Sequence, residues 1–329
     1  MNVLIVLNGK IPVTLYGGTE RIAWYLGKEL AKMGHQITFL VKKGSTCNFA
    51  KVLFIDQNKD IEDQIPNDVD IVHFNITPTR IEKIKKPFVV TIHGKTNNPN
   101  AYFDKNTIFV SKSQAAHFGS QSYVYNGLDW DDYKKPNFSK KNYFHFLGKA
   151  QWKLKNLKGA IEVIEKTKNE RLKVLGGYRI GFKMGFRFTW NTRVSFKGYV
   201  GGNKKCDLLN ASKGLIFPVL WYEPFGLAIT ESLYYGCPVF GTTHGSLKEL
   251  IKPDVGFLSN SASELANAIE NQNFSYKTCH EYALEEFNSR KMAELYYAKY
   301  LQVLNNVPLH SENPKLSHIQ PKRFLEWLD

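Results

Sequence analysis

The sequence has few cysteines and no long hydrophobic run. Its four cysteines are scattered through 329 residues without a C-x-x-C pair, which predicts reduced thiols rather than a disulfide framework or a thiolate metal site. The longest later apolar stretch, residues 214–222, is far short of the ~20 residues that a membrane-spanning helix needs. No basic residue precedes the apolar run in the opening MNVLIVLNGK, so we expect a first strand there and not a signal peptide. We therefore expect a cytoplasmic protein, or one on the cytoplasmic face of a membrane.

Acidic residues are too few to balance the basic ones. Lys and Arg number 44 against 30 Asp and Glu, which gives a formal net charge of +14. This excess fits three anionic partners, namely nucleic acid, anionic lipid or phosphorylated small molecules, and charge alone does not choose among them. The G-x-G-x-x-G fingerprint is also missing, which argues against a nicotinamide-dependent dehydrogenase.

Strand-like and helix-like patterns alternate along the chain, which predicts parallel sheets built from βαβ units. The polar segment 134–142 is the best linker. It predicts an N-terminal domain at 1–140, a second domain at 141–300 and a tail at 301–329. The expected strands are 3–7, 36–41, 71–74, 88–92, 107–110, 123–125, 143–147, 172–175, 194–196, 214–217 and 237–240. The expected helices are 18–33, 157–168, 262–271 and 279–304.

The segment from Glu223 to Glu231 has the most informative pattern in the chain. Two carboxylates are separated by seven residues, and Pro-Phe-Gly-Leu follows the first of them. Proline suits a first helical turn because it has no amide hydrogen to leave unpaired. We expect a helix that opens at Pro224 and presents its first amides, at residues 225–227, to a diphosphate. Glu223 would then lie near the reacting end of the ligand, and Glu231 about two turns into the helix, near a ribose.

This Glu-x7-Glu pattern resembles that of the retaining, family-4-type glycosyltransferases (glycosyl transferases group 1). The resemblance implies an α/β GT-B fold, in which two Rossmann-like parallel-sheet domains face each other across a cleft. It implies that Glu223 contacts the donor sugar and that Glu231 holds the ribose hydroxyls. It also implies that the diphosphate lies on the amides of three residues, Phe225, Gly226 and Leu227.

Motifs in the first domain resemble the same family more loosely. Gly17 and Gly18 follow the first strand and open a helix, where the family has a Gly-Gly turn that approaches the donor phosphate. His93 ends the strand FVVTIHG, at the position where the family has a histidine beside the donor sugar and the acceptor. Either the helical segment at 279–304 or the tail is expected to cross back toward the first domain, as in similar enzymes.

The second domain opens with cationic positions of the family. Lys149 stands where the family usually has an arginine, and Lys155 is our choice for a second cation that neutralises the leaving diphosphate. Lys153 and Lys158 remain rivals of Lys155, because the loop is longer than usual. Gly198 lies in VSFKGYV, which resembles the segment that flanks the nucleobase in the family.

Residues 178–190 combine basic and aromatic side chains. Arg179, Lys183 and Arg187 recur every four residues, as do three aromatic residues, which as a helix gives a basic ridge beside an aromatic one. Such a stripe suits either an anionic membrane or an aromatic core with a solvated basic face.

We expect a retaining glycosyltransferase that uses a UDP-, GDP- or ADP-sugar without a metal or other cofactor. The expected acceptor is a glycan or lipid-linked glycan in surface polysaccharide or glycoconjugate synthesis, with peripheral membrane contact and no nucleic acid. The alternatives are a sugar-nucleotide epimerase or phosphorylase on the same fold, and a non-catalytic protein that binds nucleic acid or membrane. An epimerase needs additional acid/base carboxylates, of which no clear set is found.

Overall fold

The structure is a computed structural model, which describes residues 1–13, 17–101, 103–140, 142–182, 186–317 and 323–328. The chain divides into two compact units. The described residues of the first unit are 1–13, 17–101, 103–130 and 287–317, and those of the second are 131–140, 142–182, 186–286 and 323–328. Among the described residues, no helix has the length and apolar character needed to span a bilayer.

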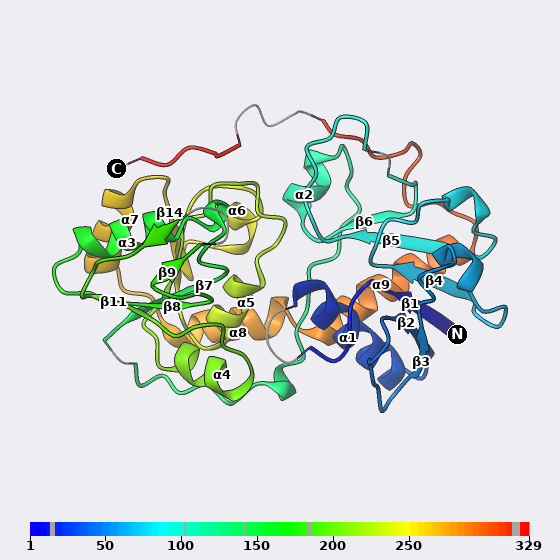
Figure 1. The fold of residues 1–329 in the computed structure, drawn as a ribbon, viewed down its shortest axis with the longest axis horizontal. Helices are drawn as coiled ribbons and strands as arrows, with labels where there is room; N and C mark the ends of the chain where they lie inside the picture. Colours follow the sequence, from blue (N-terminus) through cyan, green and yellow to red (C-terminus); the bar gives the residue numbers. More distant parts are fainter. Residues whose placement is uncertain (14–16, 102, 141, 183–185, 318–322, 329) are drawn as a thin grey trace. The chain divides into compact units, whose positions relative to one another are not determined.

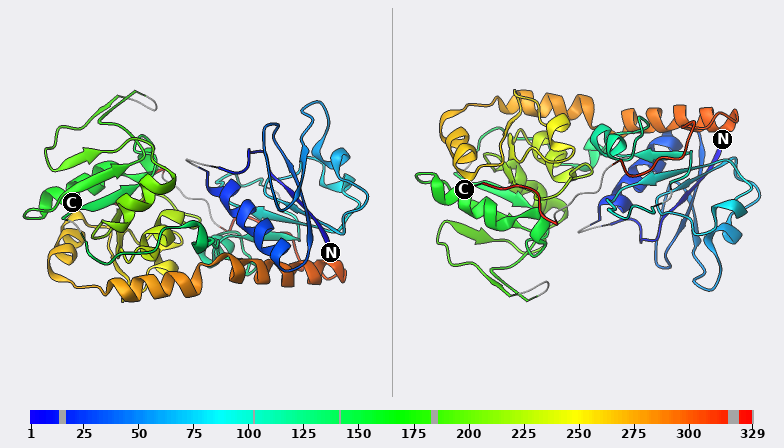
Figure 2. Two further views of the ribbon diagram at one scale, coloured as in Figure 1. Left: turned by 90° about the horizontal axis from the view of Figure 1, so that it is seen from below. Right: turned by 90° about the horizontal axis from the view of Figure 1, so that it is seen from above.

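The first unit is built on a six-stranded parallel sheet in the order β3-β2-β1-β4-β5-β6. Its strands are β1 (Asn2–Val6), β2 (Gln36–Val41), β3 (Lys51–Phe54), β4 (Ile71–Phe74), β5 (Phe88–Ile92) and β6 (Thr107–Phe109). Its helices are α1 (Gly18–Lys32), α2 (Lys112–His117), α9 (Ser289–Leu304) and the 3₁₀ turns η1 (Ile61–Gln64) and η2 (Ile81–Lys83). Figures 1 and 2 show α9 running along this unit beside α1.

The second unit repeats this architecture with a sheet in the order β11-β8-β7-β12-β13-β14, also parallel throughout. Its strands are β7 (Phe144–Leu147), β8 (Leu172–Leu175), β11 (Val194–Phe196), β12 (Leu215–Phe217), β13 (Val239–Gly241) and β14 (Gly256–Leu258). Its helices are α3 (Leu157–Lys166), α4 (Gly202–Asn210), α5 (Leu227–Tyr234), α6 (Leu247–Leu250), α7 (Ala262–Asn271) and α8 (Tyr276–Glu286), with the 3₁₀ turn η4 (Lys153–Lys155). The 3₁₀ turn η3 (Trp130–Asp132) begins on the last residue of the stretch 17–130 of the first unit.

These sheets confirm the predicted α/β fold class. Most predicted strands lie within one or two residues of their observed bounds, since each is a short run of buried apolar residues. Strands β3 and β14 were not predicted, because each is an edge strand whose residues are not all buried. The predicted strand at 123–125 forms only an isolated bridge, between Tyr123 and Phe109.

The expected helix at 279–304 is two helices. Helix α8 ends at Glu286 and α9 begins at Ser289, where the side chain of Asn288 accepts a hydrogen bond from the amide of Lys291. This N-cap starts a new helix in a different unit, so the continuous apolar pattern concealed a break.

The segment 178–190 is not a helix. Its described part contains strands β9 (Ile180–Gly181) and β10 (Arg187–Phe188), which pair antiparallel. Two glycines disfavour the helix, and aromatic residues at every second position suit a strand pair better. Lys183 of the predicted ridge lies outside the described residues, and the predicted four-residue spacing of basic side chains on a helix does not apply.

The division between the units also differs from the predicted domains. The first unit ends at Trp130 rather than at residue 140. It also includes α9, most of which lies within the predicted bounds of the second domain, although this segment or the tail was expected to cross back. His73 on β4 explains the place of α9, because its Nδ1 lies 2.6 Å from the hydroxyl of Tyr300.

The tail divides between the two units. Residues 309–317 pack on the first unit, where the amides of Lys315 and Ser317 donate hydrogen bonds to the carbonyls of Phe118 and His117. The last described residues instead join the second unit, where the amide of Leu325 donates to Leu220.

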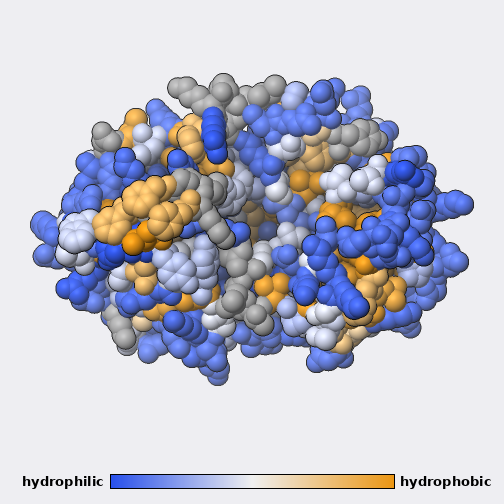
Figure 3. Space-filling view, viewed as in Figure 1, coloured by the Kyte–Doolittle hydropathy of each residue, from blue (hydrophilic) through white to orange (hydrophobic). Residues whose placement is uncertain are grey.

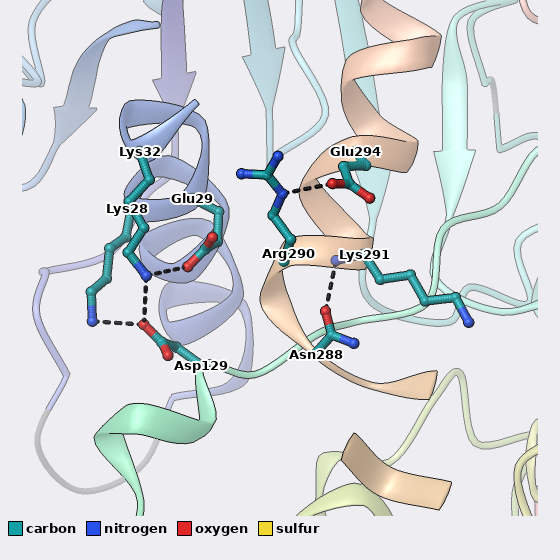
Figure 4. Close-up of polar contacts among 8 residues, drawn as sticks. All are labelled: Lys28, Glu29, Lys32, Asp129, Asn288, Arg290, Lys291 and Glu294. Carbon is teal, nitrogen blue, oxygen red and sulfur yellow. Dashed lines mark hydrogen bonds and ion pairs between the residues drawn. The ribbon is translucent and has the colours of Figure 1, made fainter. Parts of the chain in front are cut away.

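Two chain segments at the boundary lie side by side within the first unit. The amide of Leu128 donates to the carbonyl of Phe287, and the amide of Ser289 donates to that of Leu128. A Cβ atom on Gly127 would lie 2.2 Å from the carbonyl oxygen of Asn288, so this approach requires glycine. Figure 4 shows Asp129 beside α1, where Lys28 Nζ lies 2.7 Å from its carboxylate.

Candidate functional site

A buried ion pair lies at the carboxyl edge of the second unit's sheet. Lys155 follows β7 and Glu223 follows β12, and these two strands are neighbours in a parallel sheet, so the loops after them meet. Lys155 Nζ lies 2.5 Å from Glu223 Oε2, and Trp221 Nε1 donates to the same oxygen at 2.9 Å. Both charged residues are buried, with 8% and 6% of their surface exposed.

Aromatic rings surround the ammonium group of Lys155. Its Nζ lies 4.9 Å from the ring centre of Phe217, 5.3 Å from that of Trp221 and 5.5 Å from that of Trp152. The faces of these rings attract a cation, but a buried ammonium also needs an anionic partner to offset its lost hydration. Glu223 is that partner in this structure. The arrangement therefore holds the ammonium group of Lys155 in a fixed position at the edge of the sheet.

The backbone of Glu223 is fixed by the loop that follows β13. The amide of Ser246 donates to the carbonyl of Glu223 at 3.0 Å, and its hydroxyl donates to the carbonyl of Phe225 at 2.8 Å. Gly245 has φ +63°, and a Cβ atom there would lie 2.4 Å from the amide nitrogen of Glu223. Any larger residue at 245 would displace Glu223.

Helix α5 begins later than predicted. Its N-cap is Gly226 with φ +91°, and its first residue is Leu227, so Pro224 precedes the helix rather than opening it. The left-handed backbone at Gly226 turns the chain sharply between Glu223 and the helix. The predicted phosphate amides at 225–227 therefore lie on this turn and on the first helical residue.

Glu231 lies one turn into α5, not two, and forms a second buried pair. Its Oε1 lies 2.5 Å from Nζ of Lys205 on α4 and accepts a hydrogen bond from the hydroxyl of Tyr133 at 2.8 Å. Only 2% of its surface is exposed. The structure thus holds the carboxylate of Glu231 in a fixed position by groups from two other segments.

Glycines allow close backbone contacts where β7, β8 and β11 end. The amide of Gly176 donates to the carbonyl of Gly198 at 2.8 Å, and Gly198 has φ +72°. A Cβ atom on Gly176 would lie 2.2 Å from the carbonyl oxygen of Gly148, and one on Gly148 would lie 3.7 Å from Cγ of Lys155. These contacts connect Gly198 through neighbouring strands to the Lys155 loop.

The four candidate lysines differ in burial. Lys155 is buried against Glu223, whereas Lys149, Lys153 and Lys158 are exposed. Asn156, with φ +54°, accepts the amide hydrogen of Gly159 and caps α3, which holds the loop at this point. The structure therefore brings Lys155 together with Glu223 and leaves its two rivals at the surface.

His93 lies in the first unit, at the carboxyl end of β5. Its Nε2 lies 2.8 Å from Oδ1 of Asn75, which follows the neighbouring strand β4. Burial lowers the pKa of His93 to about 4, so the imidazole is neutral near pH 7. The amide of Asn75 donates in turn to the carbonyl of Val6 at 2.8 Å, so three strand ends position this histidine.

Gly17 and Gly18 stand at the start of α1, also in the first unit. Arg21 Nε donates to the carbonyl of Gly17 at 3.0 Å. A Cβ atom on Gly17 would lie 2.9 Å from both Glu20 Oε2 and Cγ1 of Val13, so a side chain there would press on its neighbours. The described contacts fit the predicted tight turn, and its role toward a phosphate stays a prediction.

Four residues that contact the predicted site residues were not predicted: Asn75, Tyr133, Lys205 and Trp221. Trp221 stands two residues before Glu223, and this closeness in sequence was an available signal. Lys205 and Tyr133 are 26 and 98 residues from Glu231, so only the folded chain shows that they meet.

Among the described residues, no group of three His, Cys, Asp or Glu side chains is arranged to hold a metal ion.

Comparisons with known proteins agree with this architecture. Residues 129–282 match the model of the family described as glycosyl transferases group 1. A glycosyltransferase involved in avilamycin A biosynthesis superposes with a TM-score of 0.72 at 20% identity, covering 95% of this chain and 99% of its own. A sucrose-phosphate synthase from Thermosynechococcus elongatus gives 0.72 at 15% identity, covering 93% and 99%. The Anabaena protein HepE, solved with UDP-glucose, gives 0.66 at 16% identity, covering 93% and 100%.

No curated protein sequence matches this chain. The two parallel sheets and the solved structures together show a GT-B fold for the chain as a whole. The matched segment, residues 129–282, contains Lys155, Glu223 and Glu231. This segment is similar to the group 1 glycosyltransferases.

Proposed function

We propose that the protein is a retaining glycosyltransferase that transfers a sugar from a nucleotide diphosphate sugar to an acceptor hydroxyl. The observation that carries the proposal is the buried Lys155–Glu223 pair, 2.5 Å apart at the carboxyl edge of a parallel sheet. Ligands of such sheets bind at this edge. The HepE structure with UDP-glucose supports a nucleotide sugar as the donor.

The donor diphosphate would lie against Lys155, Lys149 and the amides of residues 225–227. A helix N-terminus carries partial positive charge and presents amide donors, so α5 suits an anion at its start. Lysine contributes a point charge without the two-pronged geometry of arginine, so the amides would fix the orientation of the phosphates. This set of cations and amides leads us to propose transfer without a metal ion.

The rest of the nucleotide would extend over the glycine contacts and Glu231. Gly198 would flank the base, where a backbone without a side chain leaves room for a flat ring. The carboxylate of Glu231 would accept hydrogen bonds from the ribose hydroxyls, because Lys205 and Tyr133 hold it in place. Gly17 and Gly18 would bring backbone amides to the donor phosphate.

In the proposed reaction, the acceptor hydroxyl attacks the anomeric carbon on the face from which the diphosphate leaves. The bond between the sugar and the phosphate oxygen breaks as the new glycosidic bond forms, and the departing phosphate takes the acceptor proton. Negative charge then grows on the diphosphate, where Lys155 and the amides stabilise it. Positive charge grows on the sugar, where Glu223 orients and stabilises it. No protein nucleophile is required.

His93 would border the donor sugar and the acceptor as a neutral hydrogen-bonding group. Its pKa of about 4 excludes an imidazolium ion there near pH 7. We further propose that the acceptor is a glycan or lipid-linked glycan and that transfer takes place in the cytoplasm.

Two measurements on the purified full-length chain test the proposal. In a thermal-shift screen of UDP, GDP, ADP and their sugars, one base series should raise the melting temperature, since a ligand that binds only the folded state stabilises it. With that donor and a glycan acceptor, NMR of the product should show the anomeric configuration of the donor sugar. An inverted product would refute retention, and an epimerised donor formed without acceptor would favour the epimerase alternative.

A further inference from the structure

A two-stranded ribbon in the second unit carries apolar side chains on one face. We call residues 178–182 and 186–190 the aromatic ribbon. Strands β9 and β10 within it pair antiparallel, with Phe188 opposite Ile180 and Arg187 opposite Gly181. Since side chains alternate between the two faces of a strand, every second residue shares a face. In this register the residues on the same face as the Ile180–Phe188 pair are all large and apolar, namely Tyr178, Ile180, Phe182, Phe186, Phe188 and Trp190.

This face is exposed to solvent in the structure. Trp190 has 85% of its surface exposed, Phe182 76% and Phe186 73%. The rings lie against one another rather than in a core, with centroids 5.8 Å apart for Phe182 and Phe186 and 5.9 Å apart for Phe188 and Trp190. Figure 3 shows an apolar patch on the second unit, in the area where Figure 1 draws β9. Contiguous exposed apolar surface of this kind marks an interaction site.

The base of the ribbon is held firmly. Arg179 Nη1 donates to the carbonyl of Thr189 at 2.6 Å, and its Nη2 donates to the carbonyl of Val194 at 2.7 Å. These bonds cross from one strand to the other and on to β11. The aromatic face is therefore presented by an ordered support.

The sequence around the ribbon is basic throughout. Residues 171–204 contain eight lysines and arginines and no aspartate or glutamate. A second copy of this chain would bring the same positive charge to a shared interface, and like charges repel. An anionic surface is the complementary partner.

We propose that the aromatic ribbon docks on an anionic lipid bilayer, with its aromatic face in the interfacial layer and the surrounding basic residues over the headgroups. Tryptophan and tyrosine favour the membrane interface, since their rings are apolar and their polar atoms stay hydrated. Basic residues near an anionic leaflet add an electrostatic attraction, which decays within a Debye length of the membrane surface. This docking is independent of the proposed catalysis, because the ribbon contains neither Glu223 nor Lys155.

Co-sedimentation of the full-length chain with two kinds of vesicle tests the proposal. We expect binding to vesicles of phosphatidylethanolamine and phosphatidylglycerol, weaker binding to phosphatidylcholine alone, and weakening by salt. The triple variant Phe182→Ser, Phe186→Ser and Trp190→Ser should lower the partition coefficient roughly tenfold or more, since each ring loses apolar contact with the bilayer. The matched control is Phe54→Ser, Leu295→Ser and Leu301→Ser, which removes three exposed apolar residues of the first unit and should bind as the parent does.

Fluorescence quenching by brominated lipid gives a second readout. We expect quenching of the parent chain on anionic vesicles and its reduction in Trp190→Phe, which keeps an aromatic ring at that position. The melting temperature and donor affinity of every variant should equal those of the parent, which shows that folding is retained. Equal vesicle binding by the triple variant and its parent would overturn the proposal. So would a lack of vesicle binding together with self-association in sedimentation velocity that the triple variant abolishes.

Discussion

Lys155 Nζ and Glu223 Oε2 lie 2.5 Å apart, although 68 residues separate them in sequence. Among the described residues, the hydrogen bonds to the Glu223 carboxylate from Lys155 and Trp221 both reach the same oxygen, Oε2. Our proposal assigns the other oxygen, Oε1, to the donor sugar. Binding of a diphosphate beside Lys155 would share the lysine's charge between two anions, which links donor binding to the position of Glu223.

Glu223→Gln should lower turnover about 100-fold or more, because the amide lacks the charge that stabilises the positive sugar in the transition state. Its shape is nearly unchanged, so nucleotide affinity should stay close to that of the parent. Steady-state kinetics and nucleotide titration by calorimetry measure the two effects separately. Wild-type turnover in this variant would show that Glu223 has no such role. The control is Glu249→Gln, which changes an acidic residue on the short helix α6. It should leave turnover and nucleotide affinity unchanged.

Glu231→Ala should weaken nucleotide binding by roughly 10- to 100-fold, the equivalent of about 1.5–3 kcal/mol for hydrogen bonds to a charged group. It also leaves Lys205 buried without this partner, so the melting temperature should fall. Calorimetry with the nucleoside diphosphate and with the matching diphosphate that lacks a nucleoside separates the ribose contact from the phosphate contacts. An unchanged dissociation constant for the nucleotide would remove Glu231 from the binding site. Glu170→Ala, which breaks the pair with Lys213 elsewhere in the unit, is the control.

The pKa of His93, lowered to about 4 by burial, predicts a specific pH dependence. In the unfolded chain the imidazole has its ordinary pKa of about 6.5, so below that pH the unfolded state binds more protons than the folded state. The contribution of neutral His93 to the free energy of unfolding is therefore complete above pH 6.5 and is lost progressively as the pH falls toward 4. NMR of the ring carbons should show no titration of His93 between pH 5 and 8, and a titration near 6.5 in urea. Protonation near 6.5 in the native protein would contradict the neutral state of this partly buried imidazole.

Tyr300→Phe should destabilise the first unit by about 1–3 kcal/mol. It removes the hydroxyl that lies 2.6 Å from Nδ1 of His73, a buried nitrogen that would be left without this partner. Chemical denaturation measures the loss. The matched control is Tyr297→Phe, on the same helix but with its ring against His35. It should lower the free energy of unfolding by less than Tyr300→Phe does. An equal effect of the two changes would indicate that α9 is not anchored to β4 through His73.

Much of the fold could be predicted from the sequence, because buried parallel strands such as Val3–Val6 and Leu172–Leu175 are short apolar runs. The break between α8 and α9 could not, since the apolar pattern continues through it and only the cap at Asn288 marks the start of a new helix. The helix that we considered for 178–190 does not form, for a related reason. A spacing of four residues also fits every second position of a strand, and the two glycines favoured the strand pair.

For the site, the sequence indicated Glu223, Glu231 and Lys155 through spacing and resemblance. Their partners are distant in the chain, and no local pattern marks Tyr133 or Lys205 as neighbours of Glu231. The start of α5 at Leu227 also escaped prediction. Proline at 224 suits a first turn, but the left-handed backbone of Gly226 delays the helix, and sequence alone does not give that dihedral angle.

The central claim is that Lys155 binds the diphosphate of a nucleotide sugar beside Glu223. Calorimetric titration of UDP-, GDP- and ADP-sugars into the parent, Lys155→Gln and Lys158→Gln tests it most directly, because Lys158 is an exposed lysine only three residues further along, in the first turn of α3. We predict that one donor binds the parent saturably, that Lys155→Gln weakens its binding roughly tenfold or more, and that Lys158→Gln does not. Equal affinity of the parent and Lys155→Gln, with both folded, would contradict the account.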